Sequence, residues 1–261
     1  MSNDSSDNQP SPPPSSKKVG WGPLAAILVV VLSYLGVQIV ASLLVALYPQ
    51  LRGWSEARAT DWLSNTVTAQ FVYVLLNEAL LLGALGLFLR HRRASFRSLG
   101  LTRPKWVDLA YMLAAIPIYF GLYLLVLSLL GSLIHIDMNQ EQDIGFKSVV
   151  GNRDLIMTFV SLVVLPPLVE EIIFRGFLFG GLRKVLGFAW ATIGTSLLFA
   201  APHLLEGGDG KLLWIAGIDT LVLSFVLCYL REKTGRLWAS IGLHAFKNGL
   251  AFLSLFVLGM R

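Results

Sequence analysis

About seven long apolar runs constrain the fold of this chain more than any other feature. Each run approaches the roughly 20 apolar residues that an α-helix needs to cross a hydrocarbon core about 30 Å thick. The runs fall near 21–48, 66–89, 107–133, 155–182, 188–205, 213–230 and 237–258. Only helices and closed barrels satisfy the backbone in lipid, and continuous runs of this length favour helices. We therefore expect an all-α, polytopic integral membrane helix bundle with about seven (six to eight) transmembrane helices.

The composition agrees with a lipid bilayer as the main partner. Hydrophobic residues make up 55% of the 261 residues and charged residues only 14%, against about 25% charged in an ordinary soluble protein. The net charge of +5 comes from basic residues in short connectors, where they set topology and contact anionic lipid. We therefore expect no nucleic-acid partner. The single cysteine, Cys228, excludes an intramolecular disulfide, so helix packing must hold the fold.

The charges of the connectors alternate along the chain and predict its orientation. Basic connectors lie at 90–105, 183–184 and 231–236. The connectors between them are neutral or acidic and lie at 49–65, 134–154 and 206–212. Since cytoplasmic loops carry an excess of Lys and Arg, we expect the basic connectors and the N-terminus in the cytoplasm. Residues 1–18 are rich in Ser, Pro, Asn and Asp and are predicted to form a disordered cytoplasmic tail.

The fourth apolar run contains three charges in the stretch "VEEIIFRGF", residues 169–177. Charges inside a membrane are costly and usually functional. Glu171 and Arg175 are four residues apart and share one helix face, so they can pair, whereas Glu170 is rotated by about 100° and is left unpaired. Pro166-Pro167 cannot donate backbone hydrogen bonds, so the helix should restart there, with room for a polar cavity. Glu170 is therefore a candidate general base.

Two further polar clusters lie inside apolar runs. His203 follows Phe199 by four residues, and His244 and Asn248 share one face of the last run. The rise of about 1.5 Å per helical residue places Glu170 and these side chains at similar depths in the bilayer, so they could meet. Together they suit hydrolysis: a buried carboxylate takes a proton from water, one histidine orients it, and a second histidine with an amide donates to a tetrahedral oxyanion. No serine or cysteine nucleophile is needed.

The order and spacing of these residues resemble a known family. Glu170-Glu171-x-x-x-Arg175, Phe199-x-x-x-His203 and His244-x-x-x-Asn248 are similar to the three motifs of the CPBP family of intramembrane proteases. This family includes the type II CAAX-prenyl endopeptidases and bacterial relatives, some linked to bacteriocin processing and self-immunity. The resemblance covers about 150–250. Each motif alone is short, but three in order within apolar runs form a specific pattern.

The resemblance implies a glutamate-dependent intramembrane endopeptidase. Glu170 and His203 would activate the water, His244 and Asn248 would form the oxyanion site, and Glu171 and Arg175 would support the architecture. The predicted organisation has three regions: the disordered tail at 1–18, N-terminal transmembrane helices at 19–149 and, implied by the resemblance, a CPBP-like catalytic helical core at 150–258.

The resemblance leaves the cofactor open. The family is often described as metalloproteases, and His203, His244 and Glu170 could bind zinc. However, the motifs lack H-E-x-x-H, and the amide of Asn248 is a poor zinc ligand and a good hydrogen-bond donor. This favours catalysis without a metal.

Other intramembrane polar residues lie outside the motifs. Asn77-Glu78 and Asp219 could line the cavity or belong to a transport path, but we expect hydrogen-bonded contacts between helices. Lys247 is expected on another face of its helix than Asn248, where it could pair with an acid.

Two alternative functions therefore stay open. One is a non-catalytic membrane scaffold or immunity-type protein that keeps the family fold. The other is a proton-coupled transporter with Glu78, Glu170, Asp219 and the histidines as a relay, but the sequence shows no internal repeat of the apolar runs, which argues against it. For an enzyme, we expect a membrane-associated protein or peptide as substrate. No organellar targeting sequence is evident, which favours a bacterial cytoplasmic membrane.

Overall fold

The computed structural model describes residues 20–133, 136–137, 142, 144–207 and 211–259. The predicted disordered tail at 1–18 lies outside these residues. Every regular element within them is a helix, which confirms the predicted all-α fold class. In chain order the elements are α1 (Pro23–Leu51), α2 (Glu56–Asn65), α3 (Val67–His91), the 3-10 turn η1 (Phe96–Leu99), α4 (Trp106–Gly131), α5 (Gly151–Phe159), the π-helix η2 (Val160–Val164), α6 (Leu165–Glu170), the π-helix η3 (Glu171–Leu178), α7 (Phe179–Arg183), α8 (Phe188–His203), α9 (Trp214–Thr234), α10 (Trp238–Phe252) and the π-helix η5 (Leu253–Val257).

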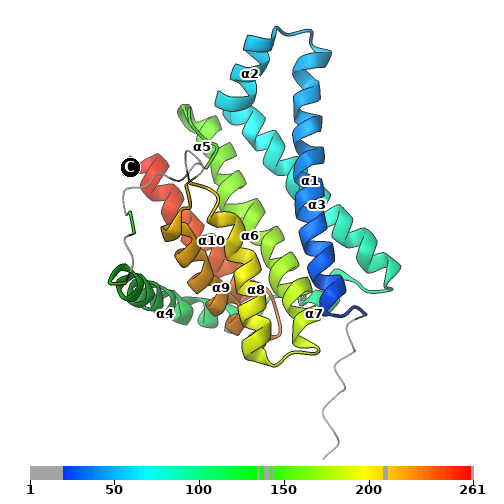
Figure 1. The fold of residues 1–261 in the computed structure, drawn as a ribbon, viewed down its shortest axis with the longest axis vertical. Helices are drawn as coiled ribbons and strands as arrows, with labels where there is room; N and C mark the ends of the chain where they lie inside the picture. The colour runs from blue at the N-terminus through cyan, green and yellow to red at the C-terminus, as the bar shows by residue number, and fades with distance from the viewer. Residues whose placement is uncertain (1–19, 134–135, 138–141, 143, 208–210, 260–261) are drawn as a thin grey trace, which may run out of the picture.

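Six helices of the described chain are long and apolar enough to cross a membrane. They are α1, α3, α4, the continuous rod from α5 to α7 at residues 151–183, α9, and α10 continued by η5. The predicted run at 188–205 forms α8 instead, which has 16 residues. At about 1.5 Å per residue it is roughly 24 Å long, shorter than a hydrocarbon core of about 30 Å. Figure 1 shows α8 beside α9 within the bundle, so the chain still reverses direction there.

The basic connectors meet at one end of the molecule, at the bottom of Figure 1. Leu237 donates its backbone N–H to Gly100 across 3.2 Å, and Arg183 pairs with Glu232 across 2.9 Å. Arg236 pairs with Asp108 at the start of α4 across 2.9 Å, and this hydrogen bond raises the pKa of the Arg236 guanidinium. The chain segments after α3, α7 and α9 therefore form one face, as the alternating charges of the connectors predict.

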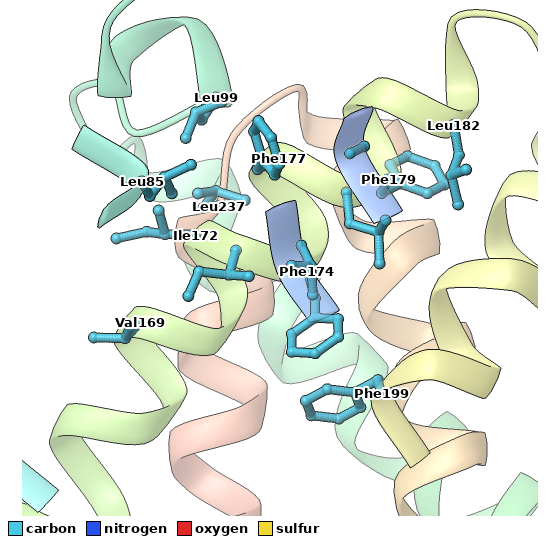
Figure 2. Packing of buried hydrophobic residues seen from close by; sticks show 14 of the residues in the cluster. Leu85, Leu99, Val169, Ile172, Phe174, Phe177, Phe179, Leu182, Phe199 and Leu237 are labelled. Atoms are coloured by element: carbon cyan, nitrogen blue, oxygen red, sulfur yellow. The ribbon is translucent and has the colours of Figure 1, made fainter. Parts of the chain in front are cut away.

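The core packs around the middle and the end of the rod. Figure 2 shows Phe177 close to Leu99, which lies in the basic connector 90–105, and to Leu237, which directly follows the connector 231–236. Phe174 lies against Phe199 of α8, with ring centroids 4.9 Å apart. Fully buried aromatic side chains contribute the largest apolar areas to a core. These contacts fix the rod relative to both its neighbours and the connector face.

The outer surface of the bundle is apolar. Leu32 and Leu43 of α1 and Leu124 of α4 are each more than 60% exposed, and many other leucines of these two helices are exposed with them. A contiguous apolar surface of this kind is unusual on a soluble monomer. It is the surface expected of helices that contact lipid on one side.

The first helices pack directly on the helices after residue 149. α1 contacts η3 and α7, while α4 contacts α9 and α10. In Figure 1, α4 lies in the lower part of the bundle, at a wide angle to the rod. The predicted division into 19–149 and 150–258 therefore does not correspond to a gap in the packing, and it stays a prediction.

The close approach of the rod to η1 gives a stability prediction. A Cβ on Gly176 would lie 2.9 Å from Leu99 Cβ and 3.2 Å from the Leu99 carbonyl oxygen, neither of which can rotate away. We expect Gly176→Val to cost about 1–3 kcal/mol through overpacking. Thermal unfolding of the purified protein in detergent measures this loss.

Gly180 provides the matched control, because it is one turn further along the rod and a Cβ there would meet no atom within 4 Å. Gly180→Val should change stability by no more than about 0.5 kcal/mol. Equal losses for the two variants would contradict the close packing of Gly176.

Candidate active site

A cavity of about 300 Å³ lies inside the bundle, between the rod, the end of α8, α9 and α10. Its polar side chains include Glu170, His203, Glu206, His244, Lys247 and Asn248. Its apolar part includes Leu162, Phe252, Leu255 and Phe256. The structure thus brings the four side chains predicted as catalytic, Glu170, His203, His244 and Asn248, to one cavity from three separate helices.

Glu170 and Glu171 point in different directions, as their helical spacing predicts. Glu171 is fully buried, and its Oε1 accepts hydrogen bonds from Arg175 Nη1 at 2.8 Å and from His244 Nδ1 at 3.1 Å. Glu170 lines the cavity, and its Oε2 lies 3.8 Å from His244 Nε2. His244 therefore lies between the two carboxylates, held by one and facing the other.

Phe199 lies against three charged or polar members of the site. The Arg175 guanidinium lies over its ring, 4.1 Å from the centroid, in a cation–π contact. The rings of His203 and His244 have their centroids 5.2 and 5.7 Å away. Phe199 appeared in the sequence only as the first residue of a motif, and its position shows why an aromatic side chain suits that place.

The hydrogen bonds of the histidines define their tautomers. His203 Nδ1 lies 2.9 Å from the Phe199 carbonyl oxygen. Because a carbonyl only accepts, Nδ1 carries the hydrogen, and Nε2 of the neutral ring keeps its lone pair. The same reasoning places a hydrogen on Nδ1 of His244, which faces the Glu171 carboxylate. Both rings can therefore accept a proton at Nε2.

Asn248 makes a contact that the sequence does not suggest. Its Nδ2 donates to the backbone carbonyl of Leu162 in η2 across 2.9 Å. An amide nitrogen carries two hydrogens, so one remains for another acceptor. Asn248 also lines the cavity.

Lys247 and Asn248 both line the cavity but contact different neighbours, and the expected pairing of Lys247 with an acid is confirmed. The cavity is lined by a helical stripe on α10 and η5, at residues 244, 247, 248, 251, 252 and 255. As adjacent residues on a helix, Lys247 and Asn248 are rotated by about 100° from each other, so they reach different elements from this stripe. Lys247 Nζ pairs with Asp219 of α9 across 2.8 Å, and Tyr119 of α4 donates to the same carboxylate. The prediction of an interhelical contact for Asp219 is thereby confirmed.

In the part of the chain that the structure describes, Asn77 and Glu78 do not make the hydrogen-bonded contact between helices that the sequence predicts. Both are buried on α3, and Asn77 Nδ2 lies 3.4 Å from Glu78 Oε1 on the same helix. Among the described residues, Glu78 Oε2 has no hydrogen-bond partner. The predicted bond to another helix is therefore absent from the described structure.

Glu206 is a cavity residue that sequence reasoning missed. It lies just beyond α8, and its Oε1 is 3.9 Å from His203 Nε2. Gln142, from the segment between α4 and α5, donates to its other oxygen. The spacing of three residues from His203 was the signal that could have identified it.

The residues predicted as possible zinc ligands line one cavity but are not grouped as a metal site. Within the described chain, no three side chains of His, Cys, Asp or Glu are grouped as a metal site. The set His203, His244 and Glu170 therefore does not fit zinc in this arrangement, and no chemical step is derived through a metal.

Comparisons with known proteins find similarity in the C-terminal part of the chain. Residues 152–250 match the family described as type II CAAX prenyl endopeptidase Rce1-like. The uncharacterized protein YyaK of Bacillus subtilis (strain 168) is 32% identical over 146 residues. This match covers 54% of the chain and 46% of the relative, so the chain spans about half of that protein's length. No solved structure matches the chain significantly.

The buried Glu171–Arg175 pair should matter far more for stability than an exposed pair. Replacing Arg175 by Met leaves a fully buried carboxylate without its cation, which costs about 3–5 kcal/mol. We expect Arg175→Met to lower the thermal midpoint strongly in detergent.

Arg183→Met is the matched control, since the Arg183–Glu232 pair is more than one third exposed at both ends. Exposed ion pairs contribute about 0–1 kcal/mol. Similar losses for Arg175→Met and Arg183→Met would contradict a structural role for the buried pair.

Proposed function

We propose that the protein is an intramembrane endopeptidase, because residues 152–250 match the Rce1-like family of type II CAAX prenyl endopeptidases. It would hydrolyse a peptide bond of a membrane-associated protein or peptide. The observation that supports this most is the convergence of Glu170, His203, His244 and Asn248 on one cavity. Three separate helices supply these side chains, which would be a costly arrangement for a purely structural bundle.

Glu170 is the proposed general base. Its carboxylate takes a proton from a water molecule in the cavity, and the water oxygen bonds to the substrate carbonyl carbon. Collapse of the tetrahedral intermediate breaks the carbon–nitrogen bond, and Glu170 returns the proton to the leaving amine. Glu170 suits both steps because its side chain faces the cavity while Glu171 carries the structural bonds.

His203 is the proposed partner of Glu170 in holding the water. Its Nδ1 is fixed by the Phe199 carbonyl, so Nε2 is the nitrogen available to accept a hydrogen bond from water. Among the described residues no direct hydrogen bond joins His203 to Glu170. The water itself would therefore connect the two side chains across the cavity.

His244 and Asn248 are the proposed donors to the oxyanion. Asn248 retains one amide hydrogen beyond the bond to Leu162. His244 can donate from Nε2 only as an imidazolium, and the carboxylates of Glu171 and Glu170 on either side of the ring would stabilise that charge. Fixed donors of this kind stabilise charge that develops in the transition state.

The proposed location is a bacterial cytoplasmic membrane with the N-terminus in the cytoplasm. The face formed by the basic connectors supports this orientation, because Lys and Arg concentrate on the cytoplasmic side. The similarity to a Bacillus protein supports a bacterial membrane. A substrate would then reach Glu170 either from the bilayer or from the end of the bundle opposite the basic connectors.

Glu170→Gln tests the proposed function directly. The amide keeps the shape of the side chain and removes the base, so we expect cleavage to fall by about 100-fold to 10,000-fold. The assay uses purified protein in nanodiscs and fluorogenic peptides with and without a lipidated cysteine, each with and without a chelator. Loss of activity with the chelator would show a metal requirement that the side-chain arrangement does not suggest.

Glu232→Gln at the connector face is the control and should cleave like the wild type. If neither the wild type nor any variant cleaves while all remain folded, the protease proposal fails, and a scaffold or immunity-type role gains weight. Proton-coupled uptake into liposomes would then test the transporter alternative through Glu78 and Asp219.

A further inference from the structure

The rod contains a carbonyl group that its own backbone cannot satisfy. In an α-helix the carbonyl of Leu162 would accept from the N–H of residue 166, and in a π-helix from that of residue 167. Both positions are proline, which has no N–H. The Leu162 carbonyl therefore has no backbone donor in either helical geometry. Within a membrane protein, an unsatisfied buried backbone group is costly.

The side chain of Asn248 supplies the missing donor. Its Nδ2 lies 2.9 Å from the Leu162 oxygen, although the two residues are 86 positions apart in the chain. Leu162, Pro166 and Asn248 all line the cavity, and α10 packs against both η2 and α6. The bond thus joins the last membrane helix to the rod at the point where the prolines interrupt the hydrogen-bond ladder of the rod.

This bond lies next to the candidate catalytic groups. His244 is one turn before Asn248 on α10, and Glu170 is one turn after Pro166 on the rod. His244 in turn reaches Glu171 and faces Glu170. The two helices are therefore connected at two levels, by Asn248 to Leu162 and by His244 to Glu171. A small slide of α10 along the rod would break the first connection and misplace the second.

We infer that Asn248 replaces the backbone donor that Pro166-Pro167 removes, and that it thereby positions α10, and with it His244, against Glu170. Asn248 is then a positioning residue in addition to any donation from its second amide hydrogen. The activity part of this inference rests on the proposed function, but the structural part does not.

The test is a stability cycle on the full-length protein in detergent. Asn248→Ala should lower the thermal midpoint by roughly 2–4 °C. Replacing both prolines, Pro166→Ala with Pro167→Ala, restores backbone N–H groups that can reach the Leu162 carbonyl. In that background, Asn248→Ala should lower the thermal midpoint by less than half as much as it does in the protein with both prolines. An equal loss in both backgrounds would overturn the inference.

Tyr119→Phe is the matched control for the cycle. It removes the hydrogen bond to Asp219 and touches neither the prolines nor Leu162. Tyr119→Phe should lower the thermal midpoint by the same amount with and without the two prolines. A reduction for Tyr119→Phe equal to that for Asn248→Ala would show a general effect of the proline replacements and would also overturn the inference.

Asn248→Asp provides a second route if the proline variants do not fold. An ionised carboxylate has the shape of the amide but only accepts hydrogen bonds, so it repels the Leu162 carbonyl. We expect a larger fall in thermal midpoint than for Asn248→Ala at neutral pH. The difference from the wild type should shrink at acidic pH, where a protonated carboxyl donates again. A wild-type midpoint for Asn248→Asp at neutral pH would contradict the inferred bond.

Activity separates positioning from a purely structural bond. If the wild type cleaves peptides, the proline replacements should restore part of the kcat lost in Asn248→Ala, with little change in KM. Recovery of the midpoint without recovery of kcat would overturn the positioning role. If the wild type does not cleave, the proposed function fails, but the midpoints still decide whether the bond exists.

Discussion

The buried carboxylate of Glu171 is the interaction on which the rest of the site depends. Its Oε1 holds both Arg175 and His244, so one oxygen atom ties the rod to α10. Arg175 extends the cluster to α8 through the ring of Phe199. Isolated buried charges are costly, but paired and hydrogen-bonded charges are tolerated and fix a unique arrangement of their helices. The adjacent glutamates thus divide their roles: Glu171 bonds to Arg175 and His244 through Oε1, whereas Glu170 faces the cavity.

Backbone geometry supports this division. Pro166-Pro167 interrupt the rod just before the glutamates, and the π-helices η2 and η3 flank the short helix α6. Such π segments are rare and occur often at functional sites. Around them, Phe177, Leu99 and Leu237 fill the connector end of the rod with apolar contacts. The irregular segment is thereby held between a dry core on one side and a polar cavity on the other.

Much of this site could be predicted because helical spacing is local information. The 100° turn between Glu170 and Glu171 and the four-residue steps to Arg175 and from His244 to Asn248 follow from helix geometry alone. Contacts between distant helices depend on rotation and tilt, which one sequence does not contain. The Lys247–Asp219–Tyr119 cluster, the contact of Glu206 with His203 and the bond from Asn248 to Leu162 are of this second kind. The length of α8 was overestimated for a related reason: apolar residues continue past the point where the helix ends.

The unsatisfied carbonyl of Leu162 could be predicted from the sequence only in part. That Pro166-Pro167 leave it without a donor follows from the sequence, but which side chain replaces the donor does not. Asn is well suited to the task, because its amide can donate to the carbonyl and still present a second hydrogen to the cavity. His244, one turn away on the same face, is held by Glu171 in the same interface. A proline pair that weakens the rod therefore also creates the acceptor that fixes α10 against it, and this ties the architecture of the cavity to the placement of Glu170.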